Sequence, residues 1–483
     1  MTTDAISAPS LQDRYLKDHG TVFLTGIHAI VRFLLDKQRR DALSGGMVRR
    51  SFMSGYEGSP LGGLDLEIRQ QADRLNEAAP FVHQAAVNEK TAAAAVHGSQ
   101  YEGNVDGFWY GKAHGVKWAL DEFSLANIAG TGKDSGVVLF CGDDHMAKSS
   151  GYPASSEQAL RDAHIPVFYP STVSEVITYA HHALALSRYA GVLCGIKLVT
   201  PICDGAETVD VNPELPSVTL PPGTTGDQPG SAESAGSAGS AESAGSAEPA
   251  GSAGSAEPAG RPGRPGSPYE KRFHQVVIST QSIPFEEELT TVRLGIAAEY
   301  ARLNGIDTVD NPDSDSPLGI IATGKSYVDL VQTLRLLNLD EKVPVLKLGV
   351  IYPVNPRSIR EFAERLKTVV VVEEKGPFVE EAAAHAILGT GVEHVYGKRG
   401  PDDRPLIPIY GELNPDLLTL RLGPMLQEIY PSAPVYDRME ELNAIAERDE
   451  GSFARRTAHY CPGCPHSVSA RAPEGEGAGG EIG

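Results

Sequence analysis

The sequence predicts an α/β protein made of two modules, each a parallel β-sheet covered by helices, joined by a disordered linker. Short apolar runs alternate with helical periodicity on both sides of the middle of the chain, which is the pattern of parallel sheets. A low-complexity stretch separates the two regions. The length of 483 residues and the 41% hydrophobic composition are enough for two or three domains.

The first region opens with a helix over 25–42, in which apolar residues recur at helical spacing. A strand at 50–54 then runs into the glycine-rich turn GYEGSPLGG at 55–63. Ligands of parallel sheets bind at the carboxyl ends of strands, which favours the loops GYEGSPLGG, AAVNEK and CGDDHMAKSS as parts of a site. Apolar runs followed by turn residues predict strands at 136–144, 165–171 and 191–200, with a helix at 173–190.

The second region repeats the alternation. A connecting helix is predicted at 283–305, and proline opens a later helix at 356–367. The remaining elements are strands at 317–324, 343–349 and 368–374 and a helix at 326–339.

The boundary between the regions is compositional. From about Pro221 to Pro268 the chain repeats GSAESA and GSAEPA units, which contain almost no residue whose burial could offset the entropy of ordering. This predicts a disordered linker. The predicted domains are a first module at 1–215, the linker at 216–270, a helical connector at 271–310, a second module at 311–450 and a separate C-terminal segment at 451–483.

Composition excludes several classes of function. A formal net charge of −21 argues against a nucleic-acid partner, which would need a basic surface. No apolar run has the length of a membrane helix, and the N-terminus lacks the apolar core of a signal peptide, so we expect a cytoplasmic protein without a membrane partner. Cys141, Cys194 and Cys203 lie in or beside apolar stretches and are interpreted as buried thiols.

Asn88 and Glu89 precede the helical run TAAAAVHG. An asparagine cap with an acidic residue in the first turn is what a helix N-terminus favours, so capping explains this pair by itself. Alternatively, Glu89 is a carboxylate at the mouth of a strand that shares a proton with a ligand nitrogen.

The polar loops also have two interpretations. GYEGSPLGG is either a tight structural turn or a loop whose backbone approaches a substrate. The loop at 142–150 is better explained as solvated surface than as a support of the site. His145, His181 and His182 have no partners at metal-ligand spacing and are interpreted as structural.

Cys461 and Cys464 form a CPGC pair near the end of the chain. A haem attachment site would need histidine directly after the second cysteine, where Pro465 stands instead. A thioredoxin-like pair should open a helix, and the following sequence forms helices poorly. Zinc or an iron-sulfur cluster would need two further ligands, and an unrelated pair of cysteines remains possible.

Taken together, these motifs resemble one family. GYEGSPLGG, VNEKTAAAAVHG, GKAHGVKWALDEF and GDDHMAKSSGYP, in this order, are similar to the pyrimidine-binding module of thiamine-diphosphate-dependent 2-oxoacid:ferredoxin oxidoreductases. GIIATGKSYVDLVQTLRLLNL and TVVVVEEKGPFVEEAAAHAI resemble the transketolase-C-terminal-like domain of that family. IPIYGELNPDLL and HYCPGCPH resemble the large indolepyruvate ferredoxin oxidoreductases in particular.

The resemblance implies roles for individual residues. Glu89 matches the glutamate that binds the aminopyrimidine ring of thiamine diphosphate and promotes its reactive tautomer. Gly58 and Ser59 match the turn near the substrate carbonyl, where the hydroxyl can polarise it. Lys112 and His114 match a lysine and a histidine facing the same cleft, with Lys112 a cofactor-binding and His114 a catalytic residue.

The implied reaction is oxidative decarboxylation of a 2-oxoacid, indolepyruvate or another aryl-pyruvate, with coenzyme A as acyl acceptor and ferredoxin as electron acceptor. Cys461 and Cys464 would bind a [4Fe-4S] cluster. In the family, a pyrophosphate module whose GDG motif holds Mg²⁺ follows this point, and no GDG occurs here. The resemblance therefore predicts an N-terminal fragment that is inactive alone and a site completed within an oligomer.

Two other classes of protein fit the same sequence. The chain could be a complementing subunit whose partner supplies the pyrophosphate module and the clusters. It could also be a non-catalytic remnant or interaction protein that binds zinc through CPGCPH.

Overall fold

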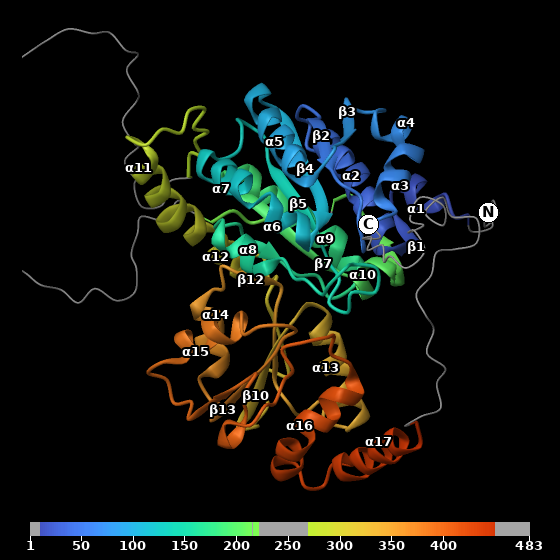
Figure 1. The fold of residues 1–483 in the computed structure, drawn as a ribbon, viewed down its shortest axis with the longest axis vertical. Coiled ribbons are helices and arrows are strands. Elements are labelled where there is room, and N and C mark those ends of the chain that lie inside the picture. The colour runs from blue at the N-terminus through green and yellow to red at the C-terminus, as the bar shows by residue number, and fades with distance from the viewer. Residues whose placement is uncertain (1–9, 215, 222–268, 450–483) are drawn as a thin grey trace, which may run out of the picture.

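The computed structural model describes residues 10–214, 216–221 and 269–449. Within these residues the chain forms two α/β units, drawn in blue to green and in orange to red in Figure 1. This confirms the predicted fold class. The low-complexity stretch, predicted to be a disordered linker, and the pair Cys461 and Cys464 lie outside the described residues.

The first unit is built on a seven-stranded sheet with the order β12-β6-β7-β5-β4-β2-β3. All neighbouring strands are parallel except β12, which pairs antiparallel with β6. The central strands are buried along their whole length, as expected for a parallel sheet covered on both faces. The strands are β2 (Arg50–Gly55), β3 (Phe81–Ala85), β4 (Val105–Lys112), β5 (Val137–Asp143), β6 (Val167–Phe168), β7 (Leu193–Val199) and β12 (Val350–Tyr352).

Two adjacent aromatic residues of β4 show how the faces are covered. Phe108 packs edge to face on Phe33 of α2 (Gly26–Leu43), beside α9 (Val173–Ala190). Trp109 points to the opposite face and packs on Phe123 of α7 (Leu120–Ala129). The remaining helices of this unit are α1 (Asp13–Leu16), α3 (Leu64–Gln70), α4 (Ala72–Leu75), α5 (Glu89–Ser99), α6 (Ala113–Trp118), α8 (Glu157–Asp162) and α10 (Thr200–Asp204).

A separate two-stranded antiparallel sheet flanks the first unit. It pairs β1 (Gly20–Thr25) with β8 (Ala206–Val211), and β1 leads directly into α2. The Thr25 hydroxyl accepts a hydrogen bond from the His28 backbone N–H and so caps this helix.

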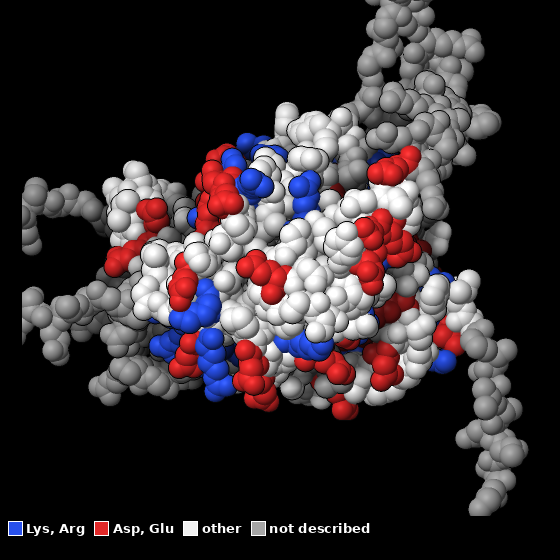
Figure 2. Space-filling view, turned by 90° about the horizontal axis from the view of Figure 1, so that it is seen from below, with Lys and Arg blue, Asp and Glu red and all other residues white. Residues whose placement is uncertain are grey.

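The second unit has a five-stranded sheet with the order β14-β13-β10-β11-β9, in which only β9 is antiparallel to its neighbour. Its strands are β9 (Thr308–Asp310), β10 (Leu318–Thr323), β11 (Val345–Leu348), β13 (Thr368–Val372) and β14 (His394–Tyr396). Its helices are α13 (Gly324–Leu336), α14 (Pro356–Ala363), α15 (Val379–Ile387), α16 (Pro415–Ile429) and α17 (Val435–Asp449). Figure 2 shows acidic and basic side chains interspersed on the face seen from below.

The two units are joined in more than one way. The predicted connecting helix is formed by α11 (Ser282–Glu287), a π-helical turn (Glu288–Arg293) and α12 (Leu294–Leu303). Chain from the second unit contributes β12 to the sheet of the first, and one hydrophobic core contains residues of both. The units therefore share a core as well as a strand. The domain boundaries proposed from the sequence remain a proposal.

Most predicted strands and helices are present, but the central strand β4 was missed. Its sequence, VDGFWYGK, contains an aspartate and two glycines that interrupt the apolar run. The glycines are required by close packing, because a Cβ at Gly107 would lie 2.9 Å from a methyl carbon of Val96. The three cysteines interpreted as buried thiols are buried.

Candidate functional site at the carboxyl edge of the first sheet

Four neighbouring strands of the first sheet end at the same edge. Gly55 at the end of β2 is in register with Ala85 of β3 and Tyr110 of β4, and Lys112 is in register with Gly142 of β5. The loops that follow these strands are the three that the sequence indicated, together with the start of α6. The structure thus brings together Gly58, Ser59, Glu89, Lys112 and His114 at one edge.

Glu89 is the first residue of α5, whose N-cap is Asn88. The Asn88 side chain accepts a hydrogen bond from Thr91 N–H at 2.9 Å, so the predicted cap is present. The Glu89 carbonyl accepts a hydrogen bond from the indole N–H of buried Trp109 at 3.1 Å, which fixes the start of the helix. The helix cap formed by Asn88 is therefore compatible with a Glu89 carboxylate placed at the mouth of a strand.

The Glu89 side chain lies in a notch formed by two glycines. A Cβ on Gly115 would lie 2.3 Å from Glu89 Cγ and 2.7 Å from Oε1, and a Cβ on Gly111 would lie 3.5 Å from Cγ. Any side chain at 115 would displace the carboxylate. Glu89 is half-buried, and within the described residues its carboxylate has no hydrogen bond or ion pair, so both oxygens can accept from a ligand.

Lys112 ends β4 and packs over the glycine-rich loop. A Cβ on Gly58 would lie 3.1 Å from Lys112 Cδ, so the absence of a side chain at Gly58 makes room for the lysine. Lys112 is 8% exposed, and in the described part of the chain its ammonium group has no carboxylate or carbonyl partner. The ammonium nitrogen is not among the buried unpaired atoms, so it keeps contact with solvent at the sheet edge and is a candidate for binding an anion.

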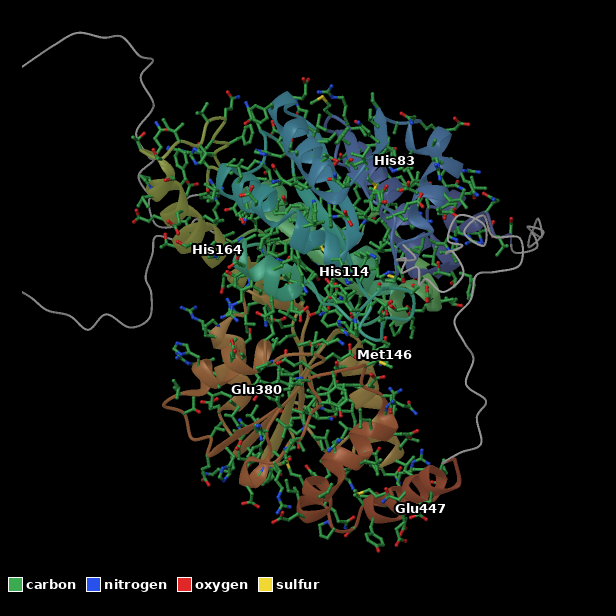
Figure 3. All side chains as sticks on the ribbon, in the orientation of Figure 1. His83, His114, Met146, His164, Glu380 and Glu447 are labelled. Atoms are coloured by element: carbon green, nitrogen blue, oxygen red, sulfur yellow. The ribbon has the colours of Figure 1, made fainter. Side chains whose placement is uncertain are left out.

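Ser59 and His114 complete the set. Ser59 is half-buried in the turn closed by the hydrogen bond from Leu61 N–H to the Gly58 carbonyl at 2.7 Å. His114 lies in the first turn of α6 and packs edge to face on Tyr152, with ring centroids 4.2 Å apart. Figure 3 labels His114 on the side of the first unit that faces the second.

The loop after β5 corrects one prediction. Residues 142–150 were interpreted as solvated surface, which holds for Met146, Lys148 and Ser149, but Gly142 to His145 are buried. His145 Nδ1 lies 2.6 Å from Oε2 of Glu374, which follows β13 in the second unit. The interpretation was wrong for these four residues because the residues that cover them, such as Leu61 at Gly142 and Glu374 at His145, are distant in sequence, where local polarity gives no signal.

Charges within this interface are balanced by one another. Burial and the neighbouring Lys197 lower the pKa of His145, but the carboxylates of Asp143 and Glu374 outweigh both and the net pKa is raised. Burial raises the pKa of Glu374, but His145 and Lys325 outweigh it and bring the pKa to about 2. His145 and Glu374 therefore form an ion pair that joins the two units.

Sequence reasoning missed Tyr152, Lys197 and the Asp65 cluster beneath the glycine-rich loop. Tyr110 donates a hydrogen bond to Asp65, and His83 lies 3.6 Å from the same carboxylate. Lys197 of β7 is buried and pairs with Asp143 at 3.1 Å and with Glu157 at 2.5 Å. Among these residues, only Lys197 had a local signal, because it is a charged residue inside an apolar strand.

The described ranges contain neither a metal-binding cluster nor a membrane-spanning helix. Residues 10–214, 216–221 and 269–449 contain no cluster of three or more histidine, cysteine or acidic side chains arranged to hold a metal ion. In the same ranges, none of the helices combines the length and apolar composition needed to cross a bilayer.

Comparison with known proteins agrees with this architecture. Residues 310–449 match the family model of the indolepyruvate oxidoreductase domain. Over 436 residues the chain is 27% identical to the indolepyruvate oxidoreductase subunit IorA of Methanothermobacter thermautotrophicus, covering 89% of this chain and 59% of the relative. It is 26% identical over 452 residues to the Archaeoglobus fulgidus subunit of the same name, covering 93% and 60%.

A solved structure shares the fold. The 2-oxoglutarate:ferredoxin oxidoreductase from Magnetococcus marinus, with 2-oxoglutarate, coenzyme A and succinyl-CoA bound, superposes with a TM-score of 0.56 at 13% identity and covers 85% of this chain and 66% of that one. The likeness to this structure shows a shared α/β fold. The sequence relatives of this chain are the indolepyruvate oxidoreductase subunits, which confirms the resemblance predicted from the motifs. The chain spans about three-fifths of their length.

Proposed function

We propose that this chain supplies the pyrimidine-binding side of a thiamine diphosphate site in an enzyme that oxidatively decarboxylates indolepyruvate or another aryl-pyruvate. The observation that carries the proposal is that two charged side chains at one sheet edge, the Glu89 carboxylate and the Lys112 ammonium, have no partner among the described residues. Folding leaves both groups available for a ligand, and ligands bind at this edge in sheets of this kind.

Glu89 is the residue that would hold the aminopyrimidine. Bound thiamine diphosphate supplies a nucleophilic carbon and an electron sink. The role of Glu89 would be to give a proton to the pyrimidine ring nitrogen and then to accept a hydrogen bond from the resulting N–H, while the Gly111 and Gly115 notch fixes the orientation of the carboxylate. The notch is what makes the residues present fit the cofactor.

Lys112, Ser59 and His114 would act on the substrate. The Lys112 ammonium is suited to the carboxylate of a 2-oxoacid, since it is a solvent-accessible cation on a largely buried side chain at the sheet edge. The Ser59 hydroxyl can donate to the ketone oxygen, and Gly58 keeps the turn open above Lys112. The His114 ring can move a proton at the same edge.

The remaining parts of the site would come from elsewhere. Mg²⁺ and the diphosphate require a pyrophosphate module. A [4Fe-4S] cluster requires ligands besides Cys461 and Cys464, and transfer to coenzyme A and ferredoxin requires their own binding sites. Because the sequence relatives are named as subunits, a complementing subunit that provides these parts is the second candidate we retain.

The test is the reaction itself in a reconstituted enzyme. We expect the chain, combined with the missing module from a curated relative, to reduce methyl viologen with indolepyruvate, coenzyme A and thiamine diphosphate. Lys112→Met should raise KM for the 2-oxoacid about 10- to 100-fold, because a hydrogen bond to a charged group is worth about 1.5–3 kcal/mol. The matched control is Lys117→Met, at an exposed lysine of α6, the short helix that begins directly after Lys112.

Either of two results would count against the proposal. Viologen reduction that does not depend on thiamine diphosphate would remove the cofactor from the mechanism. An unchanged KM in Lys112→Met would remove the assigned role of the lysine.

Gly115→Ala tests the notch through the affinity for the cofactor, without measuring the reaction. The added Cβ would overlap Glu89 Cγ, so we expect the affinity for thiamine diphosphate, measured by calorimetry on the reconstituted protein, to fall at least about 10-fold. Helix stability should not suffer, because alanine is a better helix former than glycine. Gly98→Ala in α5 is the control, since its Cβ would meet open space. Equal affinities of the two variants for thiamine diphosphate would show that the notch does not contribute to cofactor binding.

A further inference from the structure

The loop that follows β5 reaches the candidate site without an apolar anchor of its own. Within it, Asp144 accepts hydrogen bonds from Lys148 N–H at 2.9 Å and Ser149 N–H at 3.0 Å, which closes a compact turn. Its large side chains, Met146 and Tyr152, are 51% and 54% exposed. Burial of apolar surface therefore cannot fix this loop, and its position must come from other contacts.

Within the first unit, Ala154 N–H donates to the Asp144 carbonyl and Ser156 N–H donates to Asp143 at 3.0 Å, which hold the two ends of the loop together. The other contacts come from the second unit. Besides the His145 pair with Glu374, the Lys375 ammonium donates to the His145 carbonyl at 2.6 Å. At the rim, Lys148 lies 3.5 Å from Glu412, and Met146, labelled in Figure 3, lies against Gly411. Every one of these second-unit partners belongs to the segments after β13 and before α16.

Glu374 is itself held rigidly. Its Oε1 accepts a hydrogen bond from Leu413 N–H at 2.8 Å and lies 3.7 Å from Lys325 Nζ. Lys375 beside it has φ of +62°, and Ala147 in the loop has φ of +51°. Non-glycine residues adopt this left-handed conformation only where surrounding contacts hold them in it, which indicates a defined junction between the two segments.

We propose that the second unit positions the active edge of the first. Glu374 and His145 act as positioning residues that set loop 144–152, so that Tyr152 packs against His114. The functional meaning rests on the proposed function, since His114 is assigned to the substrate side of the site. Glu374 contacts His145 near the start of this loop and Tyr152 contacts His114 near its end, so the link between the two contacts is the loop backbone.

The test measures the His114 ring in the cofactor-free chain. In protein labelled with ¹³C-histidine, the ring current of Tyr152 shifts the His114 signal, which is assigned by its loss in His114→Gln. Tyr152→Ala gives the position of the signal without the neighbouring ring. We expect Glu374→Gln to move the His114 signal most of the way to this position.

Matched variants separate positioning from general destabilisation. Glu381→Gln, at an exposed glutamate of α15 that forms a salt bridge with Arg161, should leave the His114 signal in place. Lys375→Met removes one contact to the loop without leaving a charge buried, and it should move the signal in the same direction. It also serves as the test variant if Glu374→Gln does not fold.

The inference is overturned if Tyr152→Ala moves the His114 signal while Glu374→Gln and Lys375→Met both leave it unchanged. The measurement needs no cofactor or turnover. A protein that fails the viologen assay can therefore still support the positioning role, and an active enzyme can still refute it.

Discussion

Replacing Glu89 by glutamine is expected to lower the rate of indolepyruvate-dependent viologen reduction in the reconstituted enzyme by about 10²- to 10⁴-fold. The amide retains the size of the carboxylate and fits the same notch between Gly111 and Gly115. It cannot take up a proton, so the pyrimidine ring would lose its proton partner while the fold stays intact. Exchange of the thiamine C2 proton for deuterium, followed by NMR, measures the affected step directly.

The matched control for this substitution is Glu102→Gln, at an exposed glutamate of the same unit that lies 3.9 Å from Arg50. It should change neither the rate nor the C2 exchange. Normal C2 exchange in Glu89→Gln would show that another residue activates the cofactor, and the capping role of the Asn88 and Glu89 pair would then be sufficient to explain them.

The largest expected effect on stability is at Asp106. This fully buried carboxylate lies 3.0 Å from Lys37 of α2 and 2.6 Å from Arg188 of α9, and its Oδ1 accepts a hydrogen bond from Gly136 N–H. Asp106→Asn would remove one of the two carboxylates that balance buried Lys37 and partly buried Arg188, and would leave Asp41 as the remaining one. We expect a loss of about 3–5 kcal/mol in the free energy of unfolding, measured by urea denaturation.

The pH dependence of this loss follows from the pKa of Asp106. Burial alone would raise this pKa, but Arg188 and Lys37 outweigh burial and hold it well below its usual value of 3.8. A carboxylate with a lowered pKa stabilises the fold above its usual pKa, and the stabilisation disappears as the pH falls through the lowered value. The difference between wild type and variant should therefore be constant from about pH 5 to 8 and shrink only in strong acid.

Asp121→Asn, at an aspartate whose side chain is 89% exposed, is the control for Asp106 and should cost less than about 1 kcal/mol. An Asp106→Asn protein with a urea midpoint equal to that of this control would show that the buried cations find other partners. Asp41, which also pairs with Arg188 at 3.0 Å, is the residue that would then compensate.

Local sequence signals were sufficient for much of the fold. Apolar runs predicted β5, β10 and β13 because a strand buried on both faces needs continuous apolar side chains. Helical periodicity predicted α2 and α9. The same rule failed for β4. The charge of Asp106 is balanced by Lys37 and by Arg188, on helices far away in the sequence, and Gly107 is required because Val96 packs closely against it.

The candidate site divides in the same way. Asn88 and Glu89 could be selected because a helix cap has a local signature, and the glycine-rich loop could be selected by its composition. Tyr152 and Glu374 could not, because their importance lies in contacts with His114 and His145. The histidine and glutamate of that ion pair are separated by 229 positions.

The sequence by itself determined the two α/β modules, because periodicity and turn composition are local properties. The same local signals indicated the loops at one sheet edge and Glu89 as a candidate, and the family resemblance added Lys112. Only the tertiary structure decided that these two charges have no partner among the described residues, that loop 142–150 is partly buried, and that the second unit contributes a strand and an ion pair to the first. Burial and charge pairing depend on segments that meet only when the chain has folded, so neither can be obtained from the spacing of residues along it.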